Sequence, residues 1–238
     1  MEKKRVSTGI PGLDPLIGGG FPSCKSYLVT GEPGTGKSIF CVQFVLNGLM
    51  NGEKAVYVAV DEKPADIVEE AATLGWDLLQ FMEKKQLLIL DASPYFTSRT
   101  GAARGGGGVD VAKTVGDLAN YVKRMEASRV VIDPVGPLIS STDSASATQE
   151  HVRTLVHALQ DQMGTTNLLT SYNSVGHSGE LGVEEYMVAG VVELSVCRIR
   201  ERLSRTLLVR KMRGTAIDLV EHQFNIHKEK GITLKQII

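Results

Sequence analysis

The 238-residue chain has few cysteines, few aromatic side chains and almost no net charge. Its three cysteines, Cys24, Cys41 and Cys197, are too far apart for a disulfide framework or a CxxC metal site, which favours a reducing, cytoplasmic location. Lys and Arg number 26 against 27 Asp and Glu, which excludes a whole-chain basic field for nucleic acids or membranes. Aromatic residues make up only 5%, which argues against a base-stacking platform.

Long apolar runs are also missing. No stretch of about 18 apolar residues is present, so no membrane span is expected. The charged residues 1–6 lead into no apolar stretch, so a secretory signal is not expected either. Hydrophobic residues at 42% and charged residues at 22% are typical of a globular protein. With no visible linker or repeat, residues 1–238 are expected to form a single domain.

Short apolar runs alternate with amphipathic stretches, which predicts an α/β fold whose mostly parallel twisted sheet carries helices on both faces. Strands are expected at 26–30, 55–60, 87–90, 129–132 and 168–171. Helices are expected from the residues after Gly36 to Gly52, and at 64–74, 110–127 and 147–163. Further β-rich runs at 191–196, 205–209 and 224–226 leave no room for crossover helices, so they predict an antiparallel extension at the sheet edge. Four glycines at 105–108 predict a loop.

One motif carries a specific chemistry. Residues 31–38, Gly-Glu-Pro-Gly-Thr-Gly-Lys-Ser, fit G-x-x-x-x-G-K-[ST], the phosphate-binding loop. Backbone N–H groups of such a loop converge on phosphate oxygens. Lys37 is expected to reach the β and γ phosphates and Ser38 to ligate Mg²⁺ at the positive end of a helix. A flexible glycine loop is the alternative, but this motif follows a strand and opens a helix. No Asn-Lys-x-Asp motif for guanine is present, so ATP is expected rather than GTP.

Acidic residues at strand ends supply the remaining chemistry. Asp133 ends the run 130–132 and is expected to hold Mg²⁺, with Asp91 as the rival candidate at the end of 88–90. Asp61 and Glu62 are expected at the end of a strand beside the phosphate-loop strand, where a base orients the attacking water. A solvated acidic pair at a helix N-terminus is the alternative for these two residues.

Taken together, these residues resemble the KaiC/RadA-type members of the RecA ATPase superfamily, and most of all the N-terminal ATPase half of KaiC. The resemblance implies a RecA-like P-loop NTPase core, with one such half in this chain. It also implies a homo-oligomeric ring, usually a homohexamer, with ATP bound between neighbours. The segments that carry it are 7–14, 18–20, 31–38, 61–62, 75–78, 90–94, 133, 182–185 and 211–215.

The same resemblance implies site residues. Lys211 and Arg213 occupy the Lys-x-Arg-Gly positions that reach the neighbour's γ-phosphate, whereas the alternative is a basic pair that keeps an edge strand soluble. Asp61 stands where KaiC has Glu, so we expect it to act as the base, with Glu62 also required and a slow turnover. The resemblance assigns further nucleotide contacts to Gly34, Thr35, Gly36, Ile39, Thr73, Met212 and Thr215. The chain departs from the family at Ile217 and at 227–228.

The expected function is an ATP-hydrolysing oligomeric switch whose protein partner the sequence does not name. A RadA-like DNA-binding recombinase or recombination mediator is the alternative, although 140–146 and 174–182 lack the basic and aromatic residues that single-stranded DNA needs. Arg99 and Arg104 are the residues in its favour. A non-catalytic ATP-binding scaffold is the third possibility. Glu185-Tyr186 stand where KaiC's autokinase half carries its Ser-Thr pair, so autophosphorylation is not expected there.

Overall fold

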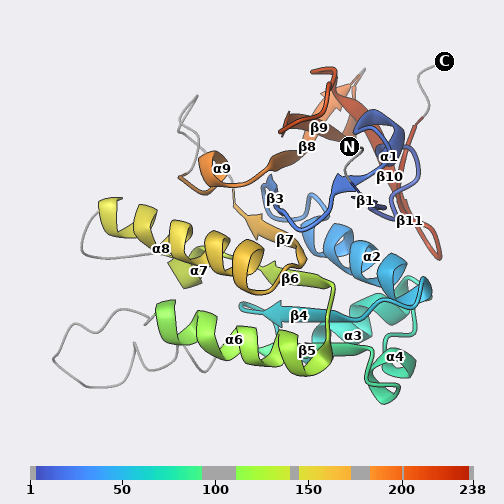
Figure 1. The fold of residues 1–238 in the computed structure, drawn as a ribbon. Coiled ribbons are helices and arrows are strands. Elements are labelled where there is room, and N and C mark those ends of the chain that lie inside the picture. Colours follow the sequence, from blue (N-terminus) through green and yellow to red (C-terminus); the bar gives the residue numbers. More distant parts are fainter. Residues whose placement is uncertain (1–3, 93–110, 140–144, 173–182, 200, 236–238) are drawn as a thin grey trace, which may run out of the picture.

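A central β-sheet organises the protein (Figure 1). The computed structural model describes residues 4–92, 111–139, 145–172, 183–199 and 201–235. In this part of the chain nine strands pair in the order β11-β10-β9-β8-β3-β7-β6-β4-β5. In chain order they are β3 (Ser26–Gly31), β4 (Ala55–Ala59), β5 (Leu87–Asp91), β6 (Arg129–Asp133), β7 (Thr166–Ser171), β8 (Gly190–Ile199), β9 (Arg202–Met212), β10 (His222–His227) and β11 (Gly231–Leu234).

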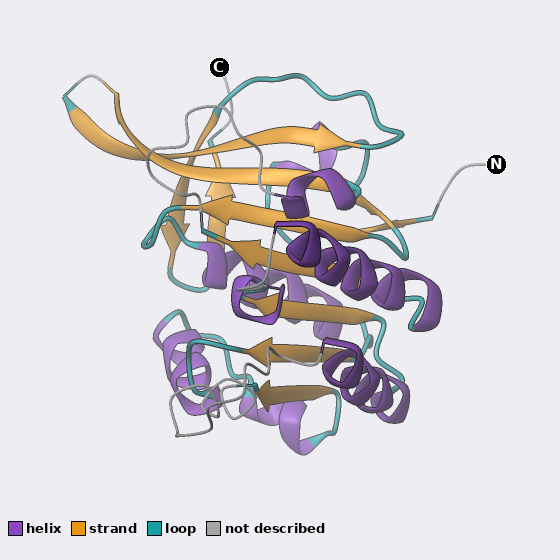
Figure 2. Cartoon of the chain, turned by 90° about the vertical axis from the view of Figure 1, so that its left-hand side faces the viewer, coloured by secondary structure: helices purple, strands orange, loops and turns teal. Residues whose placement is uncertain are grey.

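The predicted mix of parallel and antiparallel pairing is confirmed. Strands β8, β3, β7, β6, β4 and β5 run parallel, and β9, β10 and β11 continue the sheet antiparallel. Figure 2 shows the long β8–β9 hairpin projecting beyond its neighbours. Strand β8 joins the parallel and the antiparallel halves of the sheet, because it pairs parallel with β3 and antiparallel with β9.

The predicted neighbour of the phosphate-loop strand is wrong. Strand β4, which leads to Asp61 and Glu62, is separated from β3 by β7 and β6. The crossover after β3 carries the chain past two strand positions that β6 and β7 fill later. Asp61 and Glu62 therefore follow a strand that lies three positions from the phosphate-loop strand, and not next to it as the sequence suggested.

Helices cover both faces, as predicted. On one face lie α2 (Lys37–Met50), α3 (Pro64–Thr73) and α4 (Leu79–Glu83), and on the other lie α6 (Val111–Met125) and α8 (Ala145–His157), which a π-helical turn, η1 (Ala158–Gln162), extends. Alternation along β4 divides the core, because Tyr57 packs on the α2 side whereas Val56 and Val58 pack on the α6 side. The short helices are α1 (Leu13–Leu16), α7 (Gly136–Ile139) and α9 (Val183–Met187). No helix of the described residues is long and apolar enough to cross a membrane.

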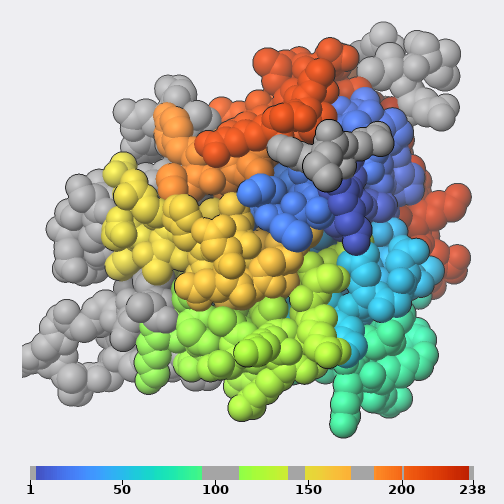
Figure 3. All heavy atoms as spheres, viewed as in Figure 1, coloured from blue at the N-terminus to red at the C-terminus, as the bar shows by residue number. Residues whose placement is uncertain are grey.

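The N-terminal segment lies against the last strands of the chain, in blue and red in Figures 1 and 3, and the Leu234 amide donates to the Pro11 carbonyl at 3.0 Å. Strands β1 (Arg5–Val6) and β2 (Phe21–Pro22) form a small separate sheet there. Arg5 Nη2 donates to Thr215 Oγ1 at 2.9 Å. Gln43 of α2 donates to the carbonyls of Gly9 at 2.9 Å and Ile232 at 3.1 Å. These bonds fix the phosphate-loop helix to both ends of the chain.

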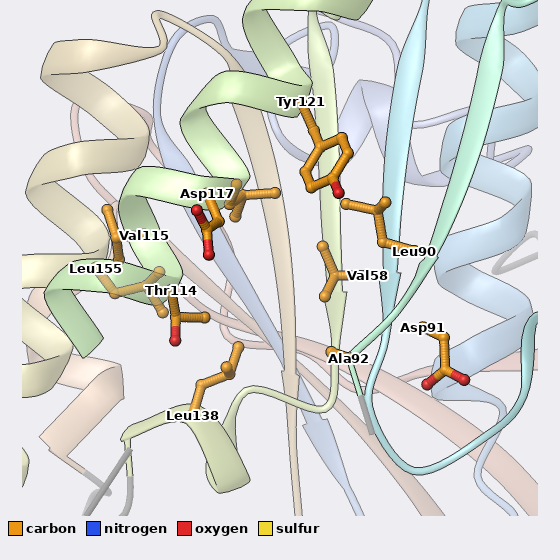
Figure 4. A pocket seen from close by; sticks show the side chains of 11 residues that line it. Val58, Leu90, Asp91, Ala92, Thr114, Val115, Asp117, Tyr121, Leu138 and Leu155 are labelled. Carbon is orange, nitrogen blue, oxygen red and sulfur yellow. The ribbon is translucent and has the colours of Figure 1, made fainter. Parts of the chain in front are cut away.

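A cavity of about 180 Å³ lies on the α6 side of the sheet (Figure 4). Asp117 and Tyr121 of α6 line it together with Val58 and Leu90. Asp91, the rival magnesium ligand of the sequence analysis, also lines it. The predicted glycine loop at 105–108, like Asp110 at the expected start of its helix, lies outside the described residues.

Candidate active site

The phosphate loop has the strand–loop–helix context that its motif requires. It leaves β3 at Gly31 and enters α2 at Lys37. Gly36 precedes the helix with φ 108°, a left-handed conformation that favours glycine. Because the first N–H groups of a helix have no partner within it, the start of α2 presents free donors at the loop. This is an anion site built from the main chain.

Lys37 is 7% exposed, although it carries the charge expected to meet phosphate. Its Nζ donates to the carbonyls of Gly31 at 2.8 Å and Glu32 at 3.0 Å. It also lies 4.7 Å from the centre of the Tyr172 ring. Burial lowers the pKa of Lys37, while the negative charge of nearby Asp133 acts in the opposite direction. The ammonium is thus held by neutral groups that a phosphate oxygen can replace.

Asp133 is anchored by two hydroxyl groups. Tyr57 donates to its Oδ2 at 2.6 Å, and Thr170 Oγ1 donates to its Oδ1. The carboxylate lies at the end of β6 and lines the same cavity as Lys37 and Ser38. Asp91, the other sequence candidate, lines the separate cavity on the α6 side of the sheet.

The acidic pair at 61–62 lies at the same cavity. The hydroxyl of Tyr172 donates to Asp61 Oδ2 at 3.2 Å. The pKa of Glu62 is raised, first by burial and then by the negative charge of Glu70 and of other nearby carboxylates, including Asp133. Both acids are accessible to a ligand in this position.

The cavity has a volume of about 280 Å³. Thr73, expected near the adenine, lines an adjoining cavity of about 180 Å³ together with Ser38, Ile39 and Trp76. Thr35 is fully buried and its Oγ1 donates to the Glu32 carbonyl at 2.8 Å, so its side chain stabilises the conformation of the phosphate loop. The predicted residues that line the main cavity are Gly34, Gly36, Lys37, Ser38, Ile39, Asp61, Glu62 and Asp133.

The structure does not bring Lys211 and Arg213 to this cavity. Met212 between them pairs with Gly190, which pairs with Tyr27 of β3, whereas the phosphate loop leaves β3 at Gly31. Four residues along a strand separate the two levels by on the order of 13 Å. Both cations instead donate to carbonyls of α9, Lys211 to Glu185 at 2.7 Å and Arg213 to Tyr186 at 2.8 Å.

The flanking positions are engaged within the fold. The side chain of Met212 is 5% exposed and belongs to the core, which leaves little of it for a ligand. Thr215 accepts the bond from Arg5 described above. Burial lowers the pKa of Lys211, and the charge of Arg213 adds to this effect. Nucleotide contacts by these four residues remain predictions.

Several residues of the cavity were missed by the sequence analysis. Tyr172, Glu70 and Arg205 line it, and Thr170 and Tyr57 hold Asp133. Thr170 and Tyr172 stand two residues apart at the end of β7, a spacing that places them on one face of a strand, and this was the available signal. Arg205 Nη2 lies 3.4 Å from the Gly34 carbonyl. This contact could not be predicted from the residues near either position.

The oxygen ligands that the protein offers are too few to hold Mg²⁺ alone, but they suit Mg²⁺ that is bound together with phosphate. Among the described residues no group of three His, Cys, Asp or Glu side chains is placed to hold a metal. Ser38 and Asp133 offer a hydroxyl and one carboxylate at the same cavity. Magnesium uses such sparse ligands when phosphate oxygens and water complete its shell.

Comparisons with known proteins identify the family of the chain. A family model described as "ATPase: KaiC" matches residues 6–237. A UPF0273 protein of Methanopyrus kandleri is 35% identical over 236 residues, covering 96% of this chain and 91% of that protein. The circadian clock oscillator protein KaiC of Thermosynechococcus vestitus is 33% identical over 229 residues, covering 95% of this chain and 43% of KaiC.

A solved structure supports the same relationship. The crystal structure of a KaiC-like protein from Pyrococcus horikoshii superposes with a TM-score of 0.83 at 30% identity, covering 99% of this chain and 100% of that one. Sequence and fold therefore agree over nearly the whole chain, and the chain belongs to the KaiC ATPase family.

Proposed function

We propose that this protein binds ATP with Mg²⁺ and hydrolyses it slowly, as a homo-oligomeric switch. One observation carries the proposal: the cavity at the phosphate loop combines the phosphate-binding residues with a surplus of carboxylates. Among the described residues that line it, Lys37 and Arg205 are cations, and Asp61, Glu62, Glu70 and Asp133 are acids. The two cations do not balance the four acids, so binding of a polyphosphate to this cavity requires further positive charge.

The chain's own residues have distinct tasks in this proposal. Lys37 leaves its loop carbonyls and binds the phosphates, with the free N–H groups at the start of α2. Ser38 and Asp133 would hold Mg²⁺, which would supply positive charge against the phosphates. Asp61 orients the attacking water and takes its proton, and Glu62 keeps that region polar.

The missing positive charge comes from a second copy. Lys211 and Arg213 lie on the order of 13 Å down the sheet from the loop of their own chain. Their placement supports a head-to-tail arrangement in which each subunit offers these cations to its neighbour. Such heterologous contacts close into rings when the rotation allows. A hexameric ring is the form that the family resemblance favours.

Phosphate release and assembly size test this proposal together. Wild-type protein is expected to release phosphate from ATP in the presence of Mg²⁺, and Lys37→Ala to abolish the release. Light scattering is expected to report a larger assembly with ATP than without nucleotide. Phosphate release that Lys37→Ala leaves intact contradicts the proposal, as does a protein that stays monomeric with ATP.

The DNA-binding alternative rests on segments that are largely outside the described residues. Titration of labelled single-stranded DNA with and without ATP distinguishes the two functions. Saturable, salt-sensitive binding is the outcome that favours a RadA-like role. The switch proposal expects no such binding.

A further inference from the structure

We propose that Tyr172 is a positioning residue of the ATPase site, which holds the Asp61 carboxylate and the Lys37 ammonium in one unit. This inference rests on the proposed function and extends it to a residue that the family resemblance does not assign. Tyr172 acts through its two partners and is not itself placed at the reacting atoms.

The fold brings Tyr172 to the centre of the site. It is the first residue after β7, which lies between the phosphate-loop strand β3 and the strand β6 that ends in Asp133. Its side chain is 51% exposed and lines the nucleotide cavity. No larger rearrangement is needed for it to meet both partners, because each already touches it.

The two contacts use different parts of the side chain. The ring faces Lys37 with 4.7 Å between Nζ and the ring centre, a cation–π geometry. The hydroxyl donates to Asp61 Oδ2 at 3.2 Å. Burial and the charge of Asp61 raise the pKa of Tyr172 to about 12, so the hydroxyl keeps its proton near neutral pH and remains a donor.

The contact with Asp61 has a direct consequence for water activation. Aspartate is one methylene shorter than glutamate, so the reach of Asp61 toward a water is short. A hydroxyl bound to Oδ2 fixes the carboxylate and leaves Oδ1 for the water. Loss of this bond lets the carboxylate rotate, and a small misplacement of a catalytic group slows a reaction strongly.

The contact with Lys37 concerns binding rather than turnover. Lys37 must exchange its loop carbonyls for phosphate, and the ring offers a partner that persists through this exchange. Removal of the ring is expected to weaken nucleotide binding by about threefold to tenfold, the range of one cation–π contact. Removal of the hydroxyl alone leaves this contact in place.

Two substitutions separate these effects. Tyr172→Phe keeps the ring and removes the hydroxyl, and Tyr172→Leu removes both. Tyr121→Phe is the matched control, because Tyr121 is 39% exposed and lines the cavity on the opposite side of the sheet. Nucleotide affinity is measured by the fluorescence of Trp76, the single tryptophan, which lines the adjoining cavity. Phosphate release gives kcat.

We expect Tyr172→Phe to lower kcat by about tenfold with an unchanged nucleotide Kd. Tyr172→Leu is expected to lower kcat similarly and to raise Kd as well, while Tyr121→Phe matches the wild type. In an Asp61→Asn background, Tyr172→Phe is expected to change the residual rate less than twofold, because coupled residues are not additive.

The outcomes separate this inference from the proposed function. A wild-type rate that Lys37→Ala abolishes, combined with a wild-type kcat for Tyr172→Phe, overturns only the role of Tyr172. An equal loss from Tyr172→Phe with and without Asp61 also overturns it, because the effect then does not pass through Asp61. No Lys37-dependent release from the wild type overturns the proposed function and this inference together.

Discussion

The hydroxyl of Tyr57 donates a 2.6 Å hydrogen bond to Oδ2 of Asp133, across the neighbouring strands β4 and β6. Tyr57 is 2% exposed, so this bond connects the core under the phosphate-loop helix with the carboxylate proposed to hold Mg²⁺. The side chain of the proposed magnesium ligand is thus oriented by a hydrogen bond from the protein core.

Tyr57→Phe is expected to reduce the free energy of unfolding by about 1.5–3 kcal/mol, the contribution of a hydrogen bond to a charged group. It is also expected to raise the Mg²⁺ concentration needed for phosphate release, because Asp133 loses an orienting partner. Urea denaturation and a Mg²⁺ titration measure the two effects. Tyr27→Phe is the control, since the Tyr27 hydroxyl is equally buried but bonds the neutral carbonyl of Pro22 at 2.6 Å. An unchanged Mg²⁺ requirement in Tyr57→Phe contradicts the orienting role.

Arg129→Met is expected to destabilise the protein by about 3 kcal/mol, because Arg129 is 1% exposed and its removal takes the cation from an ion pair whose other member, Glu53, is partly buried. Its guanidinium binds both carboxylate oxygens of Glu53 at 2.9 Å and the carbonyls of Phe44 and Ser7. Urea denaturation measures the loss. Lys54→Ala is the control, since its ion pair with Glu126 is exposed, and it is expected to leave the midpoint nearly unchanged.

The same pair makes this stability difference depend on pH. The hydrogen bonds and charge of Arg129 lower the pKa of Glu53. The stability that the pair contributes is therefore present above the ordinary pKa of a glutamate and is lost as pH falls through the lowered value. The gap between the wild type and Arg129→Met is expected to narrow in acid. A gap that widens in acid refutes this explanation.

Glu62→Gln is expected to stabilise the protein at neutral pH while slowing phosphate release. Because the pKa of Glu62 is raised, the ionised form is less favourable in the folded chain than in the unfolded one. Wild-type stability therefore declines as pH rises from the ordinary pKa through the raised one, and the amide removes this decline. Thermal midpoints across this range measure it, with Glu69→Gln as the control, an exposed residue of the helix α3 that begins two residues after Glu62. Equal midpoint shifts for both variants argue against a special environment at Glu62.

Local patterns in the sequence predicted the phosphate loop, eight of the nine strands of the main sheet and the longer helices α2, α3, α6 and α8, but not β11 or the short helices. The motif at 31–38 combines fixed spacing with a strand before it and a helix after it, so its structure follows from nearby residues. Strand order does not follow in this way. In the sheet, β7 and β6 lie between β3 and β4. This order depends on where later strands pair, so it could not be predicted from residues 55–60.

The same limit applies to the site. Asp133 was predictable because a carboxylate at the end of an apolar strand is a local signal. Tyr57 reads as an ordinary core residue, and its bond to Asp133 exists only because β4 and β6 pair. Arg205 reaches the loop from a strand that lies 171 residues farther along the chain.

A mixing experiment tests most directly whether the site is shared between two copies. Lys37→Ala lacks the phosphate-binding lysine but keeps Lys211 and Arg213, and Arg213→Ala has the opposite defect. Each variant alone is expected to be nearly inactive. In a one-to-one mixture about a quarter of head-to-tail interfaces combine an intact loop with an intact Arg213, so activity is expected to recover toward that fraction. Fluorescence energy transfer between labelled variants verifies that the subunits mix. A mixture that forms shared assemblies and yet stays inactive contradicts the account.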